Sequence, residues 1–341
     1  MIKKFKIGNI NFEKKNKPIF IAEAAVEHLG SLNVAKQMAV TAKKCGADII
    51  KYQMHIPNSE MLKNKIKFWG GSLDQILDNY NLSIDDHKEL IKFCKKINIQ
   101  YLCTPFCAEA VKVLDKLGVK GFKTGSGEML NLLLIDQIIK TKKPLILSTG
   151  MSTLEEVEFI VNYLKKNKAN FMIMNCTSIY PCPPKFVNLN LINFYKEKFN
   201  ILVGHSDHTS DIWTSLGAVA NGAQVIEKHF TLNRNLKGPD FEVSLEPDEF
   251  KIMIEASKKI SLALGKTKKI HQKEIAVRKW AHHSVVAKTN IKKFQIFTEK
   301  NITVKRPGGG IPAHEFYSVI GKRAKNKILK DEQITQKKTI N

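Results

Sequence analysis

The sequence predicts an α/β protein in which a TIM (β/α)8 barrel is followed by a small C-terminal domain. Eight short runs rich in β-branched and aromatic residues alternate with amphipathic segments, which is the pattern of repeated βα units and a parallel sheet. These units cover about 250 residues, the usual length of such a barrel. Polar side chains also end the runs, where TIM-barrel enzymes hold their active sites. A doubly wound sheet is the alternative fold class.

Each predicted strand is short and mainly apolar. In chain order the strands are residues 18–24, 48–53, 99–105, 119–126, 144–150, 171–177, 201–207 and 224–230. Helical periodicity follows at residues 31–45, 85–96, 108–117, 154–166, 209–221 and, after the last strand, 247–264. A capping box of Ser152 and Glu155 is expected to begin the helix at 154–166.

Two segments depart from this repeat. Residues 1–17 precede the first strand, and alternation around Gly8-Asn9 predicts a hairpin that closes the bottom of the barrel. Residues 54–83 are too many for an ordinary βα connection. Because they contain Trp69-Gly70-Gly71 and a short helical stretch, we expect them to form a lid over the barrel mouth.

The barrel is predicted to span residues 18–265. Residues 266–283 are charged and lack apolar periodicity, which indicates a linker or an extended helix. Residues 284–341 form a separate domain, whose short apolar runs are broken by the glycine-rich stretch 306–312. About 60 residues make only a marginal core, so this domain is expected to dock on another surface.

Composition narrows the class of protein. With 43% hydrophobic residues the chain has enough apolar material for a large core, which excludes a disordered or fibrous protein. It contains no apolar run of about 18 residues and no secretory signal pattern, so we expect no membrane span and a cytoplasmic protein. The six cysteines lack zinc-finger spacing and are predicted to be reduced thiols.

The chain is strongly basic, with 55 Lys and Arg against 32 Asp and Glu and a formal net charge of +23. A nucleic-acid partner would explain this sign. The excess is spread over every predicted helix, however, which favours solvated helix faces over nucleic-acid binding. An anionic small substrate fits the same sign.

Polar residues end every predicted strand. They are Glu23; Lys51 and Gln53; Thr104; Lys123, Ser126 and Glu128; Ser148 and Thr149; Thr177, Ser178 and Tyr180; His205, Ser206, Asp207 and His208; and Glu227, Lys228 and His229. Two lysines, several hydroxyls and the backbone amides around Gly125 and Gly127 suit a phosphate or phosphoenol group. The alternatives are a salt-bridged interior, in which Lys51 and Lys123 pair with Glu23 and Glu128, and a lysine that forms a Schiff base.

Two histidines suggest a metal site. His208 and His229 end neighbouring strands, so they can converge on one divalent cation. With Glu23 and Asp240 nearby, the mixed nitrogen and oxygen donors suit manganese or a similar ion. His205 lies two residues before Asp207, so both side chains point to the same side of the strand, and His205 is a weaker candidate metal ligand than this pair.

These residues lie in motifs that together resemble the sialic acid synthase family. In order they are Phe20-Ile21-Ala22-Glu23-Ala24, Lys51-Tyr52-Gln53, Thr104-Pro105-Phe106, Lys123-Thr124-Gly125-Ser126-Gly127-Glu128, Ser148-Thr149-Gly150-Met151, Gly204-His205-Ser206-Asp207-His208, Glu227-Lys228-His229-Phe230-Thr231 and Gly238-Pro239-Asp240. The tail Val304-Lys305-Arg306-Pro307-Gly308 resembles the family's antifreeze-like (SAF) domain, of the β-clip type.

The resemblance implies an enzyme that condenses phosphoenolpyruvate with the open-chain aldehyde of an N-acetylated hexosamine. The acceptor would be N-acetylmannosamine or a 2,4-diacetamido-trideoxyhexose, and the products a nonulosonic (sialic-type) acid and phosphate. Legionaminate or pseudaminate synthase is the alternative to N-acetylneuraminate synthase. A lysine Schiff-base aldolase and a non-catalytic binder of carbohydrate or polyanion rank lower.

The resemblance also implies residue roles, with Glu23, Lys51, Lys123 and Glu128 as the catalytic set. Phosphoenolpyruvate would be held by Lys51, Gln53, Thr104, Lys123, Ser126 and Ser148. His208 and His229 would bind the metal, with manganese first and magnesium or cobalt as alternatives, and Glu23 would orient or deprotonate the attacking water. The sugar would contact Glu128, Ser178, Tyr180 and Asp240. Arg306 would come from the partner subunit of a homodimer with exchanged C-terminal domains.

Three positions depart from the family pattern, and one of them is Ala25, which stands where glycine is common. Glu27 stands where asparagine is usual, and Ser178 stands where sialic-type members tend to have asparagine. Glu27 either faces away as a helix-start carboxylate or changes which sugar hydroxyls are recognised. These departures concern the acceptor sugar and leave the phosphoenolpyruvate and metal residues untouched.

Overall fold

The computed structural model describes residues 5–12, 17–63, 65–68, 71–236 and 238–340. The chain divides into two compact units, Met1–Gly265 and Lys266–Asn341, and each is described by itself. Trp69 and Gly70 of the expected lid lie outside the described residues.

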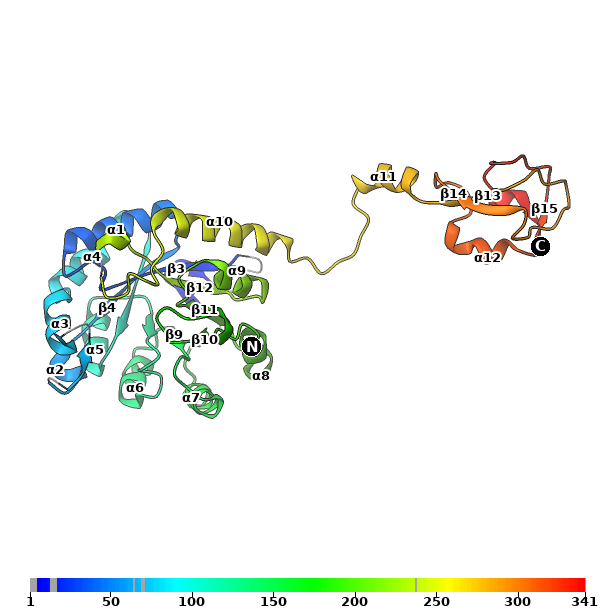
Figure 1. Ribbon diagram of the computed structural model, residues 1–341. Helices are drawn as coiled ribbons and strands as arrows, with labels where there is room; N and C mark the ends of the chain where they lie inside the picture. Colours follow the sequence, from blue (N-terminus) through cyan, green and yellow to red (C-terminus); the bar gives the residue numbers. More distant parts are fainter. Residues whose placement is uncertain (1–4, 13–16, 64, 69–70, 237, 341) are drawn as a thin grey trace. The chain divides into compact units, whose positions relative to one another are not determined.

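The first unit is built on one parallel sheet of eight strands (Figure 1). These are β3 (Ile19–Ala25), β4 (Ile49–Met54), β7 (Gln100–Pro105), β8 (Phe122–Thr124), β9 (Leu145–Ser148), β10 (Phe171–Cys176), β11 (Val203–Asp207) and β12 (Val225–His229). Neighbours follow the chain order, the last strand pairs with the first, and β7 and β8 also lie against each other. The TIM barrel is therefore confirmed, and a doubly wound sheet, which needs a reversal of strand order, is wrong.

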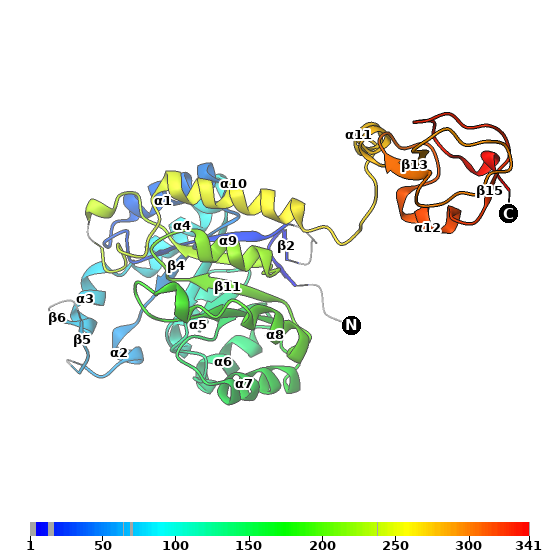
Figure 2. The same ribbon diagram turned by 45° about the vertical axis from the view of Figure 1, so that its right-hand side comes forward.

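Helices surround the strands on the outside (Figures 1 and 2). They are α1 (Leu32–Cys45), α4 (Ile84–Lys96), α5 (Ala108–Lys116), α6 (Leu132–Lys140), α7 (Leu154–Lys166), α8 (Leu191–Phe199), α9 (Trp213–Ala220) and α10 (Pro247–Ala263). The capping box of α7 consists of Thr153 and Glu156, so the prediction of Ser152 and Glu155 was wrong by one residue. The type of cap was predicted correctly, because a hydroxyl and a carboxylate three residues apart still cap the first turn.

The N-terminal hairpin closes one end of the barrel. Strands β1 (Lys6–Ile7) and β2 (Ile10–Asn11) pair on either side of the turn at Gly8 and Asn9. Phe5 and Phe12 meet edge to face, 5.1 Å between ring centroids, and both are buried. With Ile7 they pack on apolar side chains of the barrel strands, among them Ile19, Ile49 and Val225. The lower half of the barrel is thus filled by hydrocarbon.

The same strands carry polar residues at the other end. Side chains two apart on a strand share a face, so Ile21 is followed inward by Glu23, and Val225 is followed by Glu227 and His229. The register places His229 beside Glu23 on the neighbouring strand. The inward-facing side chains of these strands are therefore apolar near the N-terminal hairpin and charged at the other end of the barrel.

The long segment after β4 holds more structure than the single short helix expected. It contains α2 (Pro57–Glu60), a small hairpin of β5 (Lys67–Phe68) and β6 (Gly71–Ser72), and α3 (Leu73–Tyr80). Near its end the Asn81 amide donates to the carbonyl of His55, 2.6 Å away, so both ends of the segment meet at the barrel. We call this segment, residues 55–83, the insertion.

The second unit has its own small core. It contains α11 (Glu274–Ala281), β13 (Ser284–Ala287), β14 (Ile302–Lys305), α12 (Phe316–Val319), β15 (Arg323–Ala324) and β16 (Thr339–Ile340). Strand β13 pairs antiparallel with β14, and Val285, Phe297 and Ile328 are fully buried between the short elements. Helix α11 falls inside the expected linker and has no buried residue.

Two expectations from composition can be compared with the structure. In the part of the chain that the structure describes, no helix is long and apolar enough to cross a membrane. All six cysteines are free and buried, as the prediction of reduced thiols requires.

Two histidines buried beside the barrel wall generate a prediction about acid stability. His28 and His87 are almost fully buried, and burial lowers the pKa of each to about 4. In the unfolded chain both titrate near the ordinary value of about 6.5. Between these values the unfolded chain binds protons that the folded chain does not, so the free energy of unfolding falls as the pH is lowered. Each histidine contributes up to about 1.4 kcal/mol per pH unit.

The measurement is urea unfolding between pH 7 and pH 4.5 for the wild type and for His87→Gln. The variant should lose stability less steeply, since one proton-binding group is gone. Equal slopes for the two proteins would contradict the assignment.

Candidate functional site

A cavity of about 400 Å³ opens at the C-terminal ends of the barrel strands. All eight strands, or the loops that follow them, contribute to its wall. The lining residues are Glu23, Lys51, Gln53, Thr104, Phe106, Lys123, Gly125, Ser126, Gly127, Glu128, Met151, Cys176, Ser178, Tyr180, Ser206, His208, Glu227, His229 and Asp240. Of the site residues predicted within the barrel, only Ser148 is absent from this wall. We call this cavity the mouth cavity.

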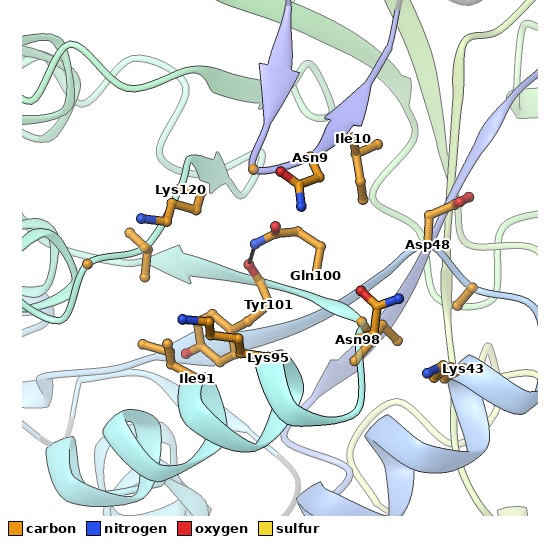
Figure 3. A pocket seen from close by; sticks show the side chains of 15 residues that line it. Asn9, Ile10, Lys43, Asp48, Ile91, Lys95, Asn98, Gln100, Tyr101 and Lys120 are labelled. Carbon is orange, nitrogen blue, oxygen red and sulfur yellow. Dashed lines mark hydrogen bonds between the residues drawn. The ribbon is translucent and has the colours of Figure 1, made fainter.

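A second cavity, of about 530 Å³, lies at the opposite end of the barrel, beside the hairpin tip (Figure 3). Lys43 and Lys95 on its rim belong to the last turns of α1 and α4. Cations there complement the negative C-terminal ends of the helix dipoles, which is a structural role. The Gln100 amide is likewise occupied, because it donates to the Tyr101 carbonyl at 2.7 Å. The convergence of charged side chains therefore assigns the functional site to the mouth cavity.

Three buried charges form the base of the mouth cavity. Glu227 lies 3.0 Å from the Lys123 ammonium and 3.8 Å from that of Lys51. Lys51 also forms an ion pair with Glu23 and donates to the Thr104 hydroxyl at 3.0 Å. The expected pairing of Lys51 with Glu23 is therefore present, whereas Lys123 pairs with Glu227 and not with Glu128. This arrangement holds both ammonium groups at the cavity wall.

Proton affinities differ sharply within this group. Burial alone would raise the pKa of Glu227, but the charges of Lys123 and Lys51 outweigh burial and lower this pKa to about 2. For Glu23 burial dominates and the pKa is raised despite Lys51. Burial lowers the pKa of Lys51, yet Glu227 and Glu23 more than offset this and leave it raised. The two lysines therefore favour the ionised form of Glu227, while Glu23 is suited to proton exchange.

The pKa shifts of the buried lysines bear on the alternative in which a lysine forms a Schiff base. A lysine that attacks a carbonyl needs a lowered pKa, so that its amine is neutral. Lys51 has a raised pKa. Lys228, whose pKa burial lowers, is fully buried, pairs with Asp207 at 3.4 Å and does not line the mouth cavity. The charged lysines of the cavity therefore suit anion binding better than covalent catalysis.

One wall of the cavity offers hydroxyl and carboxyl groups. The Ser126 hydroxyl accepts a hydrogen bond from the Gly150 main chain at 3.1 Å. Burial raises the pKa of Glu128 to about 7, and its Oε2 has no hydrogen-bond partner among the described residues. Ser148 is fully buried away from the cavity, and within the described chain its hydroxyl also lacks a partner.

The two predicted metal ligands lie together. The rings of His208 and His229 are 5.3 Å apart between centroids. His208 Nδ1 lies 3.0 Å from the Thr177 carbonyl and therefore donates, which leaves Nε2 to accept from the Tyr180 hydroxyl at 3.0 Å. His229 Nδ1 lies 3.7 Å from an Asp240 carboxylate oxygen.

The residues fit a divalent metal on their chemistry. Burial lowers the pKa of His229 well below its ordinary value, so its imidazole is neutral. For His208 burial also lowers the pKa, but the neighbouring Cys176 raises it more. The carbonyl on Nδ1 of His208 is the support that metal-binding histidines usually have. Among the described residues no three His, Cys, Asp or Glu side chains converge as a complete metal-binding group, so a metal here would also need other oxygen donors.

His205 takes no part in this pair. Its Nδ1 lies 3.1 Å from the Asn175 carbonyl, and its side chain does not line the mouth cavity. It shares the outward parity of Asp207, which the hydroxyls of Thr214 and Ser215 hold at 2.8 and 2.6 Å. This position agrees with the parity argument, which placed His205 on the same side of the strand as Asp207.

Several residues of the cavity were not selected from the sequence as site residues. Glu227, Ser206 and Cys176 all carry the inward parity of the strand ends, and the Ser206 hydroxyl donates to Glu227 at 2.9 Å. Parity with His229 was the signal that could have found Glu227. His55, just behind the cavity, contacts the Gln53 side chain at 3.0 Å and the Glu60 carboxylate at 2.9 Å. No sequence pattern marks that contact, because Glu60 belongs to the insertion.

Arg306 belongs to the second unit and follows β14. Its side chain is exposed, and its guanidinium carbon lies 5.6 Å from the centre of the Trp280 ring, within the range of a cation–π contact.

Comparisons with known proteins show the family of this chain. The model of the NeuB family matches residues 38–269, and that of the SAF domain matches residues 282–338. The chain is 43% identical over 336 residues to the N,N'-diacetyllegionaminic acid synthase of Campylobacter jejuni subsp. jejuni serotype O:2, covering 94% of this chain and 99% of that protein. It is 34% identical to the pseudaminic acid synthase of the same organism, covering 97% of this chain and 98% of that protein.

A solved structure gives the same result. The N-acetylneuraminic acid synthetase of Leptospira borgpetersenii serovar Hardjo-bovis superposes with a TM-score of 0.75 at 31% sequence identity, covering 81% of this chain and 95% of that one. Family model, sequence relatives and fold therefore lead to one conclusion: this chain belongs to the NeuB family and ends in a SAF domain.

Proposed function

We propose that this protein is a nonulosonic acid synthase that condenses phosphoenolpyruvate with the open-chain aldehyde of an N-acetylated hexosamine and releases phosphate. It is an enzyme of the carbon–carbon bond-forming transferase type. The observation that carries the proposal is the pair of buried lysines, Lys51 and Lys123, which share the ionised Glu227 at the base of the mouth cavity.

The phosphoenolpyruvate end of the cavity contains the two ammonium groups. Once Glu23 is protonated, two lysines against the ionised Glu227 leave positive charge for a carboxylate and a phosphate, and burial strengthens that attraction. The Gln53 amide, the Thr104 hydroxyl and the Ser126 hydroxyl line the same wall and supply hydrogen bonds. Ser148, which the resemblance also assigned to phosphoenolpyruvate, does not line this cavity.

Glu23 has the proton-transfer role. Its raised pKa and its position beside Lys51 suit a group that takes a proton from the water attacking C2 of phosphoenolpyruvate. The enol carbon C3 bonds to the aldehyde carbon, the water oxygen bonds to C2, and phosphate leaves as C2 becomes a ketone. Glu128, which also lines the mouth cavity and has a pKa raised to about 7 by burial, can exchange a proton with the sugar.

Sialic acid synthases generally depend on a divalent metal. In this chain His208 and His229 would hold it, with manganese as the first candidate and magnesium or cobalt as alternatives. When bound, such an ion supplies a Lewis acid that polarises the sugar aldehyde. Tyr180 and Asp240, next to the two histidines, face the same space and are assigned to the sugar with Ser178.

The acceptor is best matched to a 2,4-diacetamido-2,4,6-trideoxymannose. The support is the comparison within Campylobacter jejuni, where identity is 43% to the N,N'-diacetyllegionaminic acid synthase and 34% to the pseudaminic acid synthase; the Legionella pneumophila N,N'-diacetyllegionaminic acid synthase is 32% identical. N-acetylmannosamine and the corresponding altrose are the alternatives.

The active form is a homodimer with exchanged C-terminal domains in the cytoplasm. Ile275, Val277 and Trp280 on α11 are each about half exposed, at 49%, 51% and 57%, so this helix presents apolar surface that its own unit does not cover. A partner barrel would cover it, and Arg306 would then reach the partner's mouth cavity.

The reaction is tested by phosphate release from phosphoenolpyruvate with manganese, using the three sugars in parallel. Release should be fastest with 2,4-diacetamido-2,4,6-trideoxymannose, and borohydride should trap no covalent adduct. No phosphate release with any of the three sugars, or a trapped lysine adduct, would contradict the proposal.

The histidine pair is tested by His208→Ala and His229→Ala. Each variant should lose bound manganese and at least about 100-fold in kcat/KM, because one of two protein nitrogens is removed. His271→Ala, at an exposed position, is the control. Full manganese retention together with full turnover in His208→Ala would refute the assignment.

Arg306→Ala tests the exchanged domain. We expect it to raise KM for the sugar about tenfold or more while KM for phosphoenolpyruvate changes little, since the two lysines hold the latter. Arg323→Ala is the matched control, an exposed arginine of the same unit. Equal effects on both substrates would remove the role of Arg306 in sugar binding.

A further inference from the structure

Glu27 is a buried carboxyl group without a cationic partner. It follows β3, is only 2% exposed and belongs to none of the ion pairs among the described residues. Burial raises its pKa to about 7. The cap of α1 is Ser31, so Glu27 is not the helix-start carboxylate considered from the sequence. It does not line the mouth cavity either, so it makes no direct contact with a sugar there.

The Glu27 carboxyl group instead binds the loop that follows β12. Its Oε1 accepts a hydrogen bond from the Asp240 main-chain N–H at 2.8 Å. The two segments are neighbours because β3 and β12 pair in the barrel. On the other side of the loop the Ser244 hydroxyl donates to the Asp240 carbonyl, also at 2.8 Å. The main chain at Asp240 is thus held from both sides.

Gly238 completes this contact. A Cβ atom added at Gly238 would lie 2.4 Å from Oε2 of Glu27 and 2.6 Å from Oε1. Gly238 has no left-handed φ, so glycine is needed here for space. The carboxyl group therefore occupies the volume that any side chain at this position would need.

The Asp240 side chain lines the mouth cavity beside His229. We propose that Glu27 is a positioning residue for the acceptor sugar: its carboxyl group fixes the Asp240 main chain and thereby directs the Asp240 carboxylate into the cavity. The sugar part of this inference rests on the proposed function, in which Asp240 contacts the acceptor. The structural part, the Glu27–Asp240 contact, can be tested without turnover.

The test uses two variants on opposite sides of the contact and one that preserves it. Glu27→Ala removes the acceptor, Gly238→Ala displaces the carboxyl group, and Glu27→Gln keeps an acceptor oxygen at the same reach. Hydrogen exchange of the peptide spanning residues 238–245 and steady-state kinetics are measured for each. Glu255→Ala, an exposed carboxylate on α10, is the matched control.

Glu27→Ala and Gly238→Ala should exchange this peptide at least about tenfold faster than the wild type, because the Asp240 amide loses its acceptor. KM for the sugar should rise at least about fivefold while KM for phosphoenolpyruvate stays within about twofold. Glu27→Gln should restore most of both properties.

Unchanged exchange in both alanine variants would overturn the inference, whatever their activity. Faster exchange with equal rises in both KM values would overturn the link to the sugar. A wild type that is inactive with all three sugars would refute the proposed function, and the exchange data would still decide whether Glu27 holds Asp240.

Discussion

The rest of the site depends on one shared carboxylate. Glu227 carries a full negative charge in the barrel interior and holds two ammonium groups that would otherwise repel each other. A buried cation without a partner is too costly to keep, so this anion, together with Glu23 beside Lys51, stabilises the charged form of the lysines. With Glu23 ionised these four charges cancel, and once Glu23 is protonated the cavity wall carries one positive charge in excess. An anionic ligand then finds donors that are already in place, so little rearrangement is needed on binding.

Strand register decides which charges can meet. Inward positions of β12 give Glu227 and His229, whereas the outward Lys228 pairs with Asp207 on the neighbouring strand and packs under α9. Lys228 and Glu227 are adjacent in the chain, yet Lys228 forms an ion pair on the outward side of the strands, whereas Glu227 lines the mouth cavity. A register shift of one residue in this strand would turn Lys228 inward and Glu227 outward, and each charge would then lose its present partner.

Much of this arrangement was predictable, because alternation and strand ends are properties of the sequence. The eight strands, the hairpin around Gly8 and the proximity of His208 and His229 follow from local pattern and spacing. Contacts between distant segments were not predictable in this way. The Glu27 carboxyl group reaches Asp240 across more than 200 residues, and its partner is a main-chain N–H, which leaves no mark on side-chain composition.

Small errors had equally physical origins. Ser152 and Thr153 are both good helix caps with a glutamate three residues later, so the sequence alone could not choose between them. The structure selects Thr153. The insertion was expected to contain one short helix, whereas the structure gives it a small hairpin and two helices, with contacts between α2 and α3 and a hydrogen bond from Asn81 to His55.

The insertion leaves and rejoins the barrel at nearly the same point, through His55 and the Asn81 amide. A loop with such close ends can change length at little entropic cost, about 0.6 kcal/mol for each doubling. Its interior is therefore free to diversify while Gln53, held by His55, keeps its place in the wall. A change in the length of this one segment therefore leaves the anion-binding lysines, which belong to other parts of the barrel, in place.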